Sequence, residues 1–309
     1  TQKVTSPEIY TVQTRSGRKI EITGDHCLVT IKDGVVNSVR GDKVQLGSFL
    51  PVPRKIDNTS EQKGYIDCYE ILKSTNNRFL WKKDGQVGIR NRSSGLTIPD
   101  KLNLTSDFYK LLGFFTSEGM IANNKALVSS IVPDILEIVK KYYESINVKY
   151  HYAKAKNKVV GIFVNNWPFR TLLEKLEVSG KADKKRVPGL IYSSSTENIA
   201  QYIKSYFEGD GTVGKHEISA TTKSKGLSSD LLYLLSFFGI IARVHVSRKR
   251  ATNVFNSGKR TYYKVTISGQ DNIRKYINQI GFITDRKNNL AKTLIKSSNT
   301  NIDIVPELG

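Results

Sequence analysis

Hydrophobic and polar residues alternate with a period of two along the first 55 residues, and turn signals such as Ser16-Gly17 and Asp33-Gly34 interrupt the alternation. This pattern predicts a small all-β module over residues 1–55. Its expected strands are the alternating segments 8–14, 18–24, 26–32, 34–40 and 47–53. Residues 56–103 are mixed, and we interpret them as a connector or accessory segment with a helix at 68–74 and a hairpin around Asp84-Gly85.

The apolar spacing changes to a helical period after residue 104, and the new pattern occurs twice. Apolar stripes predict three helices in each copy, at 106–119, 132–146 and 167–177, then at 196–211, 226–239 and 271–280. The segments between them predict four hairpins. One ends near residue 130, and the others cover residues 148–166, 212–223 and 240–268. The repeated order predicts an α+β core made of two repeats. We assign residues 104–180 to repeat 1, and residues 181–309 to a linker, repeat 2 and a tail.

The first helix of each repeat ends with a small residue, an acid and a glycine. An offset of 92 positions aligns Gly113 with Ser205, Ser117 with Gly209, and Glu118 with Asp210. Small residues four apart lie on one helix face and let two helix backbones approach closely. If the two helices pack through these faces, we expect Glu118 and Asp210 to meet at the same end.

Both acids lie in a last helical turn, where the helix dipole disfavours a carboxylate by about 0.3–1 kcal/mol. Placing two of them together adds like-charge repulsion. A divalent cation between Glu118 and Asp210 would remove both penalties, and oxygen ligands suit Mg²⁺, with Mn²⁺ as a substitute. One such acid alone is more often an ordinary exposed residue, but the matched pair favours a metal site. Glu208 aligns with Thr116 and breaks the symmetry, so we predict that it is a surface residue.

Composition points to a polyanionic partner. The 309 residues carry a formal net charge of +20, which favours nucleic acid first and an anionic membrane surface second. No apolar run approaches the roughly 18 residues of a membrane span, and no signal peptide is evident. Only two cysteines occur, which suits an intracellular location in the cytoplasm or nucleoid, or in the nucleus of a eukaryote. The start at Thr1 and the single Met120 suggest an excised or trimmed piece.

The second hairpin of each repeat is strongly basic. Two-stranded ribbons fit the major groove of DNA, and phosphate contacts would make binding sensitive to salt. A solvated hairpin kept for solubility is the alternative, and the occurrence of two in equivalent places favours DNA contact. The candidate DNA-binding residues are Lys149, Lys154, Lys156, Lys158, Arg243, Arg248, Arg250, Lys259, Arg260 and Lys264.

The segments "LLGFFTSEG" and "IKSYFEGDG" resemble the paired motifs of single-chain LAGLIDADG homing endonucleases. The resemblance covers about residues 104–309 and implies a pseudo-two-fold αββαββα fold. It implies a monomer whose two four-stranded saddles straddle a long, weakly symmetric site in double-stranded DNA, with residues 56–103 as an accessory DNA-binding segment. The implied reaction is hydrolysis of one phosphodiester in each strand, leaving 3′ overhangs, with Glu118 and Asp210 as catalytic metal ligands.

Two lysines match family positions that place positive charge near the reacting phosphate. Lys185 lies in "KKRVPGL", just before the second motif helix, and Lys287 lies in "GFITDRKNNL", after the closing helix. The resemblance implies a catalytic role for both. Lys184 is a neighbour that could take the place of Lys185.

The N-terminal module resembles part of an intein splicing (Hint-like) domain. "GRKIEITGDHCLVT" is similar to the Thr-x-x-His segment of inteins, with Thr23 and His26 in place. "VQLGSFLPVPRKI" resembles the strand region that follows, although Ser48 stands where an acid is usual. Inteins start at Cys or Ser and end in His-Asn, whereas this chain starts at Thr1 and ends "PELG". We therefore expect an intein-type endonuclease that does not splice, with a trimmed or degenerate splicing domain.

Two alternatives remain at this point. The first is a non-cleaving protein on the same scaffold, such as an RNA maturase or a DNA-binding regulator. The second is a protein-splicing intein whose terminal splice residues lie outside this chain.

Overall fold

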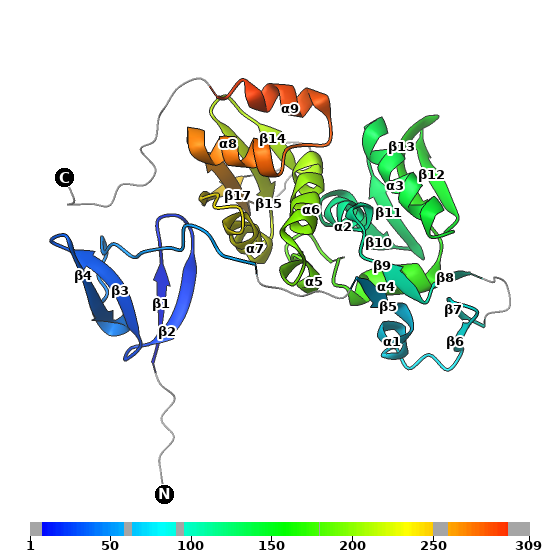
Figure 1. Ribbon diagram of the computed structural model, residues 1–309, viewed down its shortest axis with the longest axis horizontal. Helices are drawn as coiled ribbons and strands as arrows, with labels where there is room; N and C mark the ends of the chain where they lie inside the picture. The colour runs from blue at the N-terminus through cyan, green and yellow to red at the C-terminus, as the bar shows by residue number, and fades with distance from the viewer. Residues whose placement is uncertain (1–7, 59–63, 91–95, 179, 250–258, 296–309) are drawn as a thin grey trace, which may run out of the picture.

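The computed structural model describes residues 8–58, 64–90, 96–178, 180–249 and 259–295 (Figure 1). Over these residues the chain forms an N-terminal β module, a connector, and a core of two repeats that meet at a central pair of helices. None of the described helices is long and apolar enough to cross a bilayer.

The N-terminal module consists of two antiparallel hairpins. β1 (Ile9–Gln13) pairs with β2 (Lys19–Thr23), and β3 (Cys27–Lys32) pairs with β4 (Val35–Arg40), which confirms four of the predicted strands. A short 3₁₀ helix, η1 (Gly41–Lys43), follows them.

The fifth strand predicted for this module is wrong. Over residues 47–53 only Phe49 pairs, in one bridge to Ile31. Pro51 and Pro53 lack the backbone N–H that a ladder needs. The module also has little interior, because Ile22 is the only buried hydrophobic residue in its described part.

The connector folds together with repeat 1. β5 (Tyr65–Asp67) pairs with β9 (Lys101–Asn103), and β6 (Leu80–Lys83), β7 (Gln86–Ile89) and β8 (Thr97–Pro99) form a three-stranded sheet. The predicted helix is confirmed as α1 (Cys68–Lys73), and the predicted Asp84-Gly85 turn joins β6 to β7. Buried connector residues such as Leu72 and Val87 belong to the same hydrophobic cluster as the core. The connector is therefore part of one packed body with the repeats.

Each repeat contains a four-stranded antiparallel sheet. Repeat 1 contributes β10 (Gly119–Ala122), β11 (Lys125–Ser129), β12 (Tyr150–Ala155) and β13 (Lys158–Val164). Repeat 2 contributes β14 (Gly211–Val213), β15 (Glu217–Thr222), β16 (Ala242–Lys249) and β17 (Arg260–Ser268). The strand order β10-β11-β13-β12 matches β14-β15-β17-β16, which confirms the predicted duplication.

All six predicted helices of the repeats are confirmed. They are α2 (Ser106–Glu118), α3 (Pro133–Ser145), α4 (Trp167–Lys175), α6 (Thr196–Gly209), α7 (Lys225–Ser236) and α8 (Gln270–Gln279). Side-chain caps fix several starts: the Thr105 hydroxyl accepts from the Phe108 N–H, and the Ser195 hydroxyl accepts from the Asn198 N–H. Two helices were not predicted, α5 (Gly189–Tyr192) in the linker and α9 (Asp285–Lys292) in the tail.

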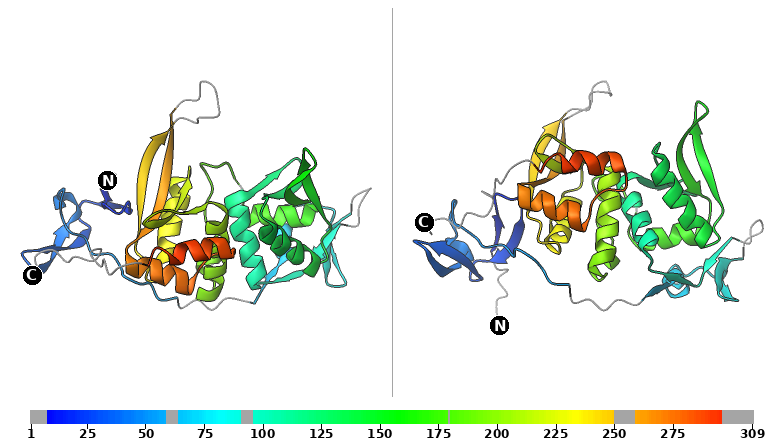
Figure 2. Two further views of the ribbon diagram at one scale, coloured as in Figure 1. Left: turned by 90° about the horizontal axis from the view of Figure 1, so that it is seen from above. Right: turned by 45° about the horizontal axis from the view of Figure 1, so that its top comes forward.

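The helices α2 and α6 lie side by side at the centre of the molecule (Figures 1 and 2). Their contact is reciprocal, with Gly113 against Ser205 and Gly209 against Ser117. A methyl group added to either glycine would lie only 2.8 Å from the Cβ atom of the opposing serine. The close approach predicted from the small residues is confirmed. In both views of Figure 2, the hairpins β12–β13 and β16–β17 project to the same side of this helix pair.

Candidate metal and nucleic-acid site

The two candidate acids stand at the same end of the central helix pair. Glu118 is the last residue of α2 and Asp210 is the C-cap of α6; β10 and β14 begin at the next residue in each case. Both side chains are partly buried. A Cβ atom on Gly209 would lie 3.0 Å from Cγ of Glu118, so Glu118 packs against the residue that precedes Asp210.

The electrostatics of Asp210 show that the acids lie within each other's field. Burial, and after it the negative charge of Glu118, raise the pKa of Asp210 to about 7, although Lys185 and Lys287 oppose the shift. The ammonium groups of Lys185 and Lys287 therefore do not offset the effects of burial and of Glu118 on the pKa of Asp210. The predicted meeting of the two acids is confirmed, and the arrangement is unfavourable for a metal-free carboxylate pair.

Lys185 binds the end of the repeat 1 helix. Its Nζ donates to the carbonyl oxygens of Thr116 at 2.8 Å and Ser117 at 3.0 Å, in the last turn of α2. A cation there complements the helix dipole, and burial lowers the pKa of Lys185. Lys184 is exposed. The lysine at the site is therefore Lys185.

Lys287 makes the equivalent contact in repeat 2. Its Nζ donates to the carbonyl oxygens of Phe207, Glu208 and Gly211 at 3.1, 2.5 and 2.8 Å. The residue is only 8% exposed, and burial lowers its pKa. The turn that carries Asp210 is thus held from both sides of that residue.

The prediction that Glu208 is a surface residue is wrong. Glu208 is 5% exposed, and its carboxylate accepts hydrogen bonds from the Ile283 N–H at 2.8 Å and from the Thr284 N–H and hydroxyl at 3.2 and 2.8 Å. Its Oε1 lies 3.9 Å from Nζ of Lys287. Partners 75 residues away in sequence satisfy this charge, so only tertiary packing could reveal its burial. Glu208 anchors the start of α9, the helix that presents Lys287.

A second positioning device was missed by the sequence analysis. Arg186 makes a bidentate ion pair with Asp230 of α7, at 2.6 and 2.7 Å, and the Val187 N–H donates to the same carboxylate. The Ser224 hydroxyl donates to the carbonyl oxygen of Lys185 at 2.6 Å. These contacts fix the linker on both sides of the Lys185 side chain. The only cue in the sequence is an acid within the apolar stripe of α7.

Most predicted DNA-binding residues lie on the two long hairpins. Lys156 is in the β12–β13 turn, where it and Asn157 have φ angles of 46° and 62°. Lys264 departs from the prediction, because it is partly buried and forms an ion pair with Glu217. Arg250 lies outside the described residues. The exposed residues are Lys149, Lys154, Lys156, Lys158, Arg248, Lys259 and Arg260, and Arg243 is partly buried.

The candidate splicing residues meet at one turn of the N-terminal module. The His26 N–H donates to the Thr23 carbonyl oxygen at 3.1 Å, and the His26 side chain is exposed. A hydrogen bond from the Thr23 side chain lowers the pKa of the neighbouring Asp25. The module contacts repeat 2 through a hydrogen bond from the Val244 N–H to the Ser16 carbonyl oxygen.

The donor set fits a hard divalent cation that retains water ligands. Within the described ranges, no cluster of three or more His, Cys, Asp or Glu side chains is present. Glu118 and Asp210 alone supply two carboxylates, which suits Mg²⁺ or Mn²⁺ completed by water and phosphate oxygens. Burial and then the negative charge of Glu118 raise the pKa of Asp210, and a bound cation would stabilise both carboxylates.

A model of a known protein family matches part of the chain. A model of the LAGLIDADG-like domain matches residues 197–281, which include Asp210, so repeat 2 is LAGLIDADG-like. The replication factor C small subunit of Methanocaldococcus jannaschii is 26% identical over 296 residues, which are 95% of this chain and 14% of that protein. The DNA-directed RNA polymerase subunit Rpo1C of the same organism is 23% identical over 318 residues, 98% of this chain and 34% of that protein.

The chain therefore spans a minor part of the length of these curated relatives. Among solved structures, that of I-DmoI in complex with DNA and Mn is similar, with a TM-score of 0.42 and 14% sequence identity. This match covers 58% of the present chain and 98% of that chain.

Proposed function

We propose that this protein is a site-specific, metal-dependent DNA endonuclease that hydrolyses one phosphodiester in each strand of a long target. The observation that carries the proposal is the pair Glu118 and Asp210 at one end of two touching helices, where burial and mutual repulsion raise the pKa of Asp210. A stability argument alone would not place two acids at helix C-termini in this way. A bound divalent cation would offset both the helix-dipole penalty and the repulsion between the two carboxylates.

Glu118 and Asp210 would hold Mg²⁺ or Mn²⁺, which supplies Lewis acidity and a water of lowered pKa for phosphodiester hydrolysis. Lys185 uses two ammonium hydrogens on α2 carbonyls, which leaves a third for a phosphate oxygen. Lys287 uses its three on α6 and β14 carbonyls. It therefore acts as a positioning residue that fixes the turn of Asp210 and contributes its positive field.

The two basic hairpins would hold the DNA on each side of the acids. They project to the same side of the helix pair (Figure 2), and seven of their basic candidates are exposed. Contacts from Lys and Arg to phosphates would supply most of the affinity, with a strong dependence on salt. The net charge of +20 fits that role.

The pattern of relatives supports the proposal that this chain originated as an intein-type element. Two proteins with unrelated names, a replication factor C subunit and an RNA polymerase subunit, each contain a segment similar to nearly all of this chain. A self-contained element inserted in different proteins would give this result. Thr23 and His26 at one turn make protein splicing the second candidate function, which sequencing the parent reading frame across both ends would test.

Selection of cleaved sites from a random double-stranded DNA library tests the main proposal. The chain is incubated with Mg²⁺ or with EDTA, and Asp210→Asn serves as the control. We expect one family of long sites to be cut in both strands with Mg²⁺ only, and at least about a thousandfold more slowly by Asp210→Asn. Binding of the selected site by this variant should stay within a few-fold of the parent. Bound but uncut sites would instead favour a non-cleaving DNA-binding protein, and selection of RNA alone would favour a maturase.

A further inference from the structure

The open face of each four-stranded sheet is the one turned away from its helices. In β11, Ala126 and Val128 are fully buried, whereas Leu127 between them is partly exposed. In β13, Ile162 and Val164 are likewise buried, and Phe163 is partly exposed. Because side chains alternate along a strand, Leu127 and Phe163 belong to the open face of the repeat 1 sheet.

Strand register places four residues of repeat 1 in one row across this open face. The row runs Met120, Leu127, Phe163, His151. The His151 ring stacks on Phe163 with centroids 5.3 Å apart, and Nζ of Lys125 lies 4.4 Å from the Phe163 centroid. Apart from the imidazole of His151 at its end, the row is apolar, and Met120 is 52% exposed.

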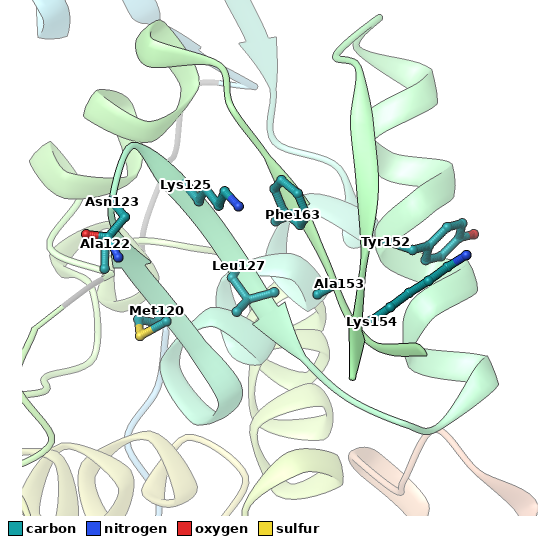
Figure 3. Close-up of a pocket in the computed structure, with 9 residues that line it drawn as sticks. All are labelled: Met120, Ala122, Asn123, Lys125, Leu127, Tyr152, Ala153, Lys154 and Phe163. Carbon is teal, nitrogen blue, oxygen red and sulfur yellow. The ribbon is translucent and has the colours of Figure 1, made fainter. Parts of the chain in front are cut away.

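This row borders a hollow of about 340 Å³ on the open face (Figure 3). Figure 3 shows Leu127 and Phe163 on neighbouring strands, with Tyr152 and Lys154 extending from β12. The next row of the sheet contains Ser129, Gly161 and Ala153, whose small size leaves the hollow open. Lys154 thus supplies a positive charge at the rim of the hollow, and Leu127 and Phe163 supply apolar surface inside it.

The matching positions of repeat 2 are polar. The corresponding row runs Thr212, Ser219, Thr266, Arg243, and the next row runs Thr221, Lys264, His245. Ser219 and Thr266 are only 5% and 4% exposed, and Lys264 pairs with Glu217 beside them. Equivalent backbone positions thus present hydroxyl, imidazole and guanidinium groups in place of an apolar hollow.

We propose that the hollow of repeat 1 recognises thymine C5-methyl groups in the major groove of its half-site, whereas repeat 2 reads its half-site through polar groups. This inference rests on the DNA-binding function proposed above. Leu127 and Phe163 offer no hydrogen bond to a base edge, and the thymine methyl is the apolar feature that the major groove displays. Lys154 at the rim and Lys125 over the Phe163 ring place positive charge that suits the flanking phosphates.

Replacing thymine by uracil in the DNA tests this inference without altering the protein. The target selected from the random library is prepared with uracil in one half-site at a time, and Kd is measured with Asp210→Asn in Mg²⁺ to prevent cutting. The half-site of repeat 1 is assigned as the one that loses phosphate protection in the Lys158→Ala variant. We expect Kd to rise about fourfold per contacted methyl in that half-site, and less than twofold in the other.

The protein side is tested by Leu127→Ser, which copies the residue of repeat 2 at the equivalent position. We expect this variant to bind thymine and uracil half-sites with nearly equal Kd, and Tyr152→Phe, on the rim, to keep the fourfold difference. A selected repeat 1 half-site without thymine, or a uracil effect that is absent or equal in both half-sites, would overturn the inference. These outcomes leave the endonuclease proposal standing, which fails if no DNA site is cut in both strands with Mg²⁺.

Discussion

The central helices of repeat 1 and repeat 2 each end against a lysine, yet different contacts hold the two lysines in place. Lys185 lies in a linker that repeat 2 grips through Arg186, Asp230 and Ser224. Lys287 lies on α9, whose start is anchored by the buried Glu208. Where repeat 2 has Glu208, repeat 1 has Thr116, whose hydroxyl accepts from the Tyr202 hydroxyl at 2.9 Å.

The comparison shows which properties a duplication keeps and which it lets diverge. The helix contact, the acid, the glycine after it and the lysine on the terminal carbonyls occur in both halves, because each depends on backbone geometry. The supporting side chains differ, because many combinations can satisfy one buried ammonium group or one anchoring site. The two halves are consequently similar in shape and unequal in chemistry, and four predictions sharpen or break that conclusion.

The helix contact should be the least tolerant shared feature. We expect Gly113→Ala to destabilise the fold by about 2–4 kcal/mol, because the new methyl would collide with Ser205 and with the backbone of Tyr202. Gly209→Ala should cost less, since it collides with the side chain of Ser117. Urea unfolding measures both, with Gly189→Ala as control because nothing lies within 4 Å of its added methyl.

Exchanging the serine and the glycine tests whether the contact is reciprocal. The double variant Ser117→Gly with Gly209→Ala should recover about half or more of the stability lost by Gly209→Ala alone. Additive losses in the double-mutant cycle would show that the two positions do not share one contact, and the pseudo-two-fold helix interface would be wrong.

Replacing Lys287 and replacing Lys185 should lower stability by different amounts but slow cleavage to a similar extent. Lys287→Ala removes a charged donor from three carbonyls and should lower stability by about 2–3 kcal/mol, whereas Lys185→Ala should lose about half as much. We expect both to slow single-turnover cleavage about tenfold or more, and Lys287→Ala to slow it more than it weakens binding.

Lys184→Ala is the matched control, because Lys184 is the exposed neighbour of Lys185. Cleavage by this variant should stay within twofold of the parent. A large defect in Lys184→Ala beside an unaffected Lys185→Ala would reverse the assignment of the two lysines.

The smallest effect concerns pH in the absence of metal. The folded pKa of Asp210 is about 7 and its ordinary value is 3.8, so between these values the folded protein binds a proton that the unfolded chain has released. The free energy of unfolding should therefore fall as pH rises through that window, by on the order of 2 kcal/mol from pH 5 to pH 8. Thermal unfolding in EDTA at both pH values measures this.

Asp210→Asn should remove most of that pH dependence, and Mg²⁺ should stabilise the parent at pH 8 but not this variant. Glu118→Gln should flatten the dependence only in part, because burial remains. An unchanged pH profile in Asp210→Asn would show that a group other than Asp210 titrates in this window.

Local sequence determined much of this protein. Apolar periods and capping residues predicted six helices of the repeats, and small residues at matched spacing placed Glu118 beside Asp210. These features are readable because each depends on residues within a few positions of one another. The two lysines were reached by resemblance, and the resemblance to an intein splicing domain stays a prediction.

Only the tertiary structure decided the partners of the charged groups. Arg186 and Asp230 are 44 residues apart, and Glu208 and Ile283 are 75 apart. The same holds for α9, a polar segment that becomes a helix where Lys287 and Ala291 can be buried. Burial and long-range pairing set the pKa of Asp210 and the hollow beside Phe163, since both depend on which distant side chains fill the surrounding space.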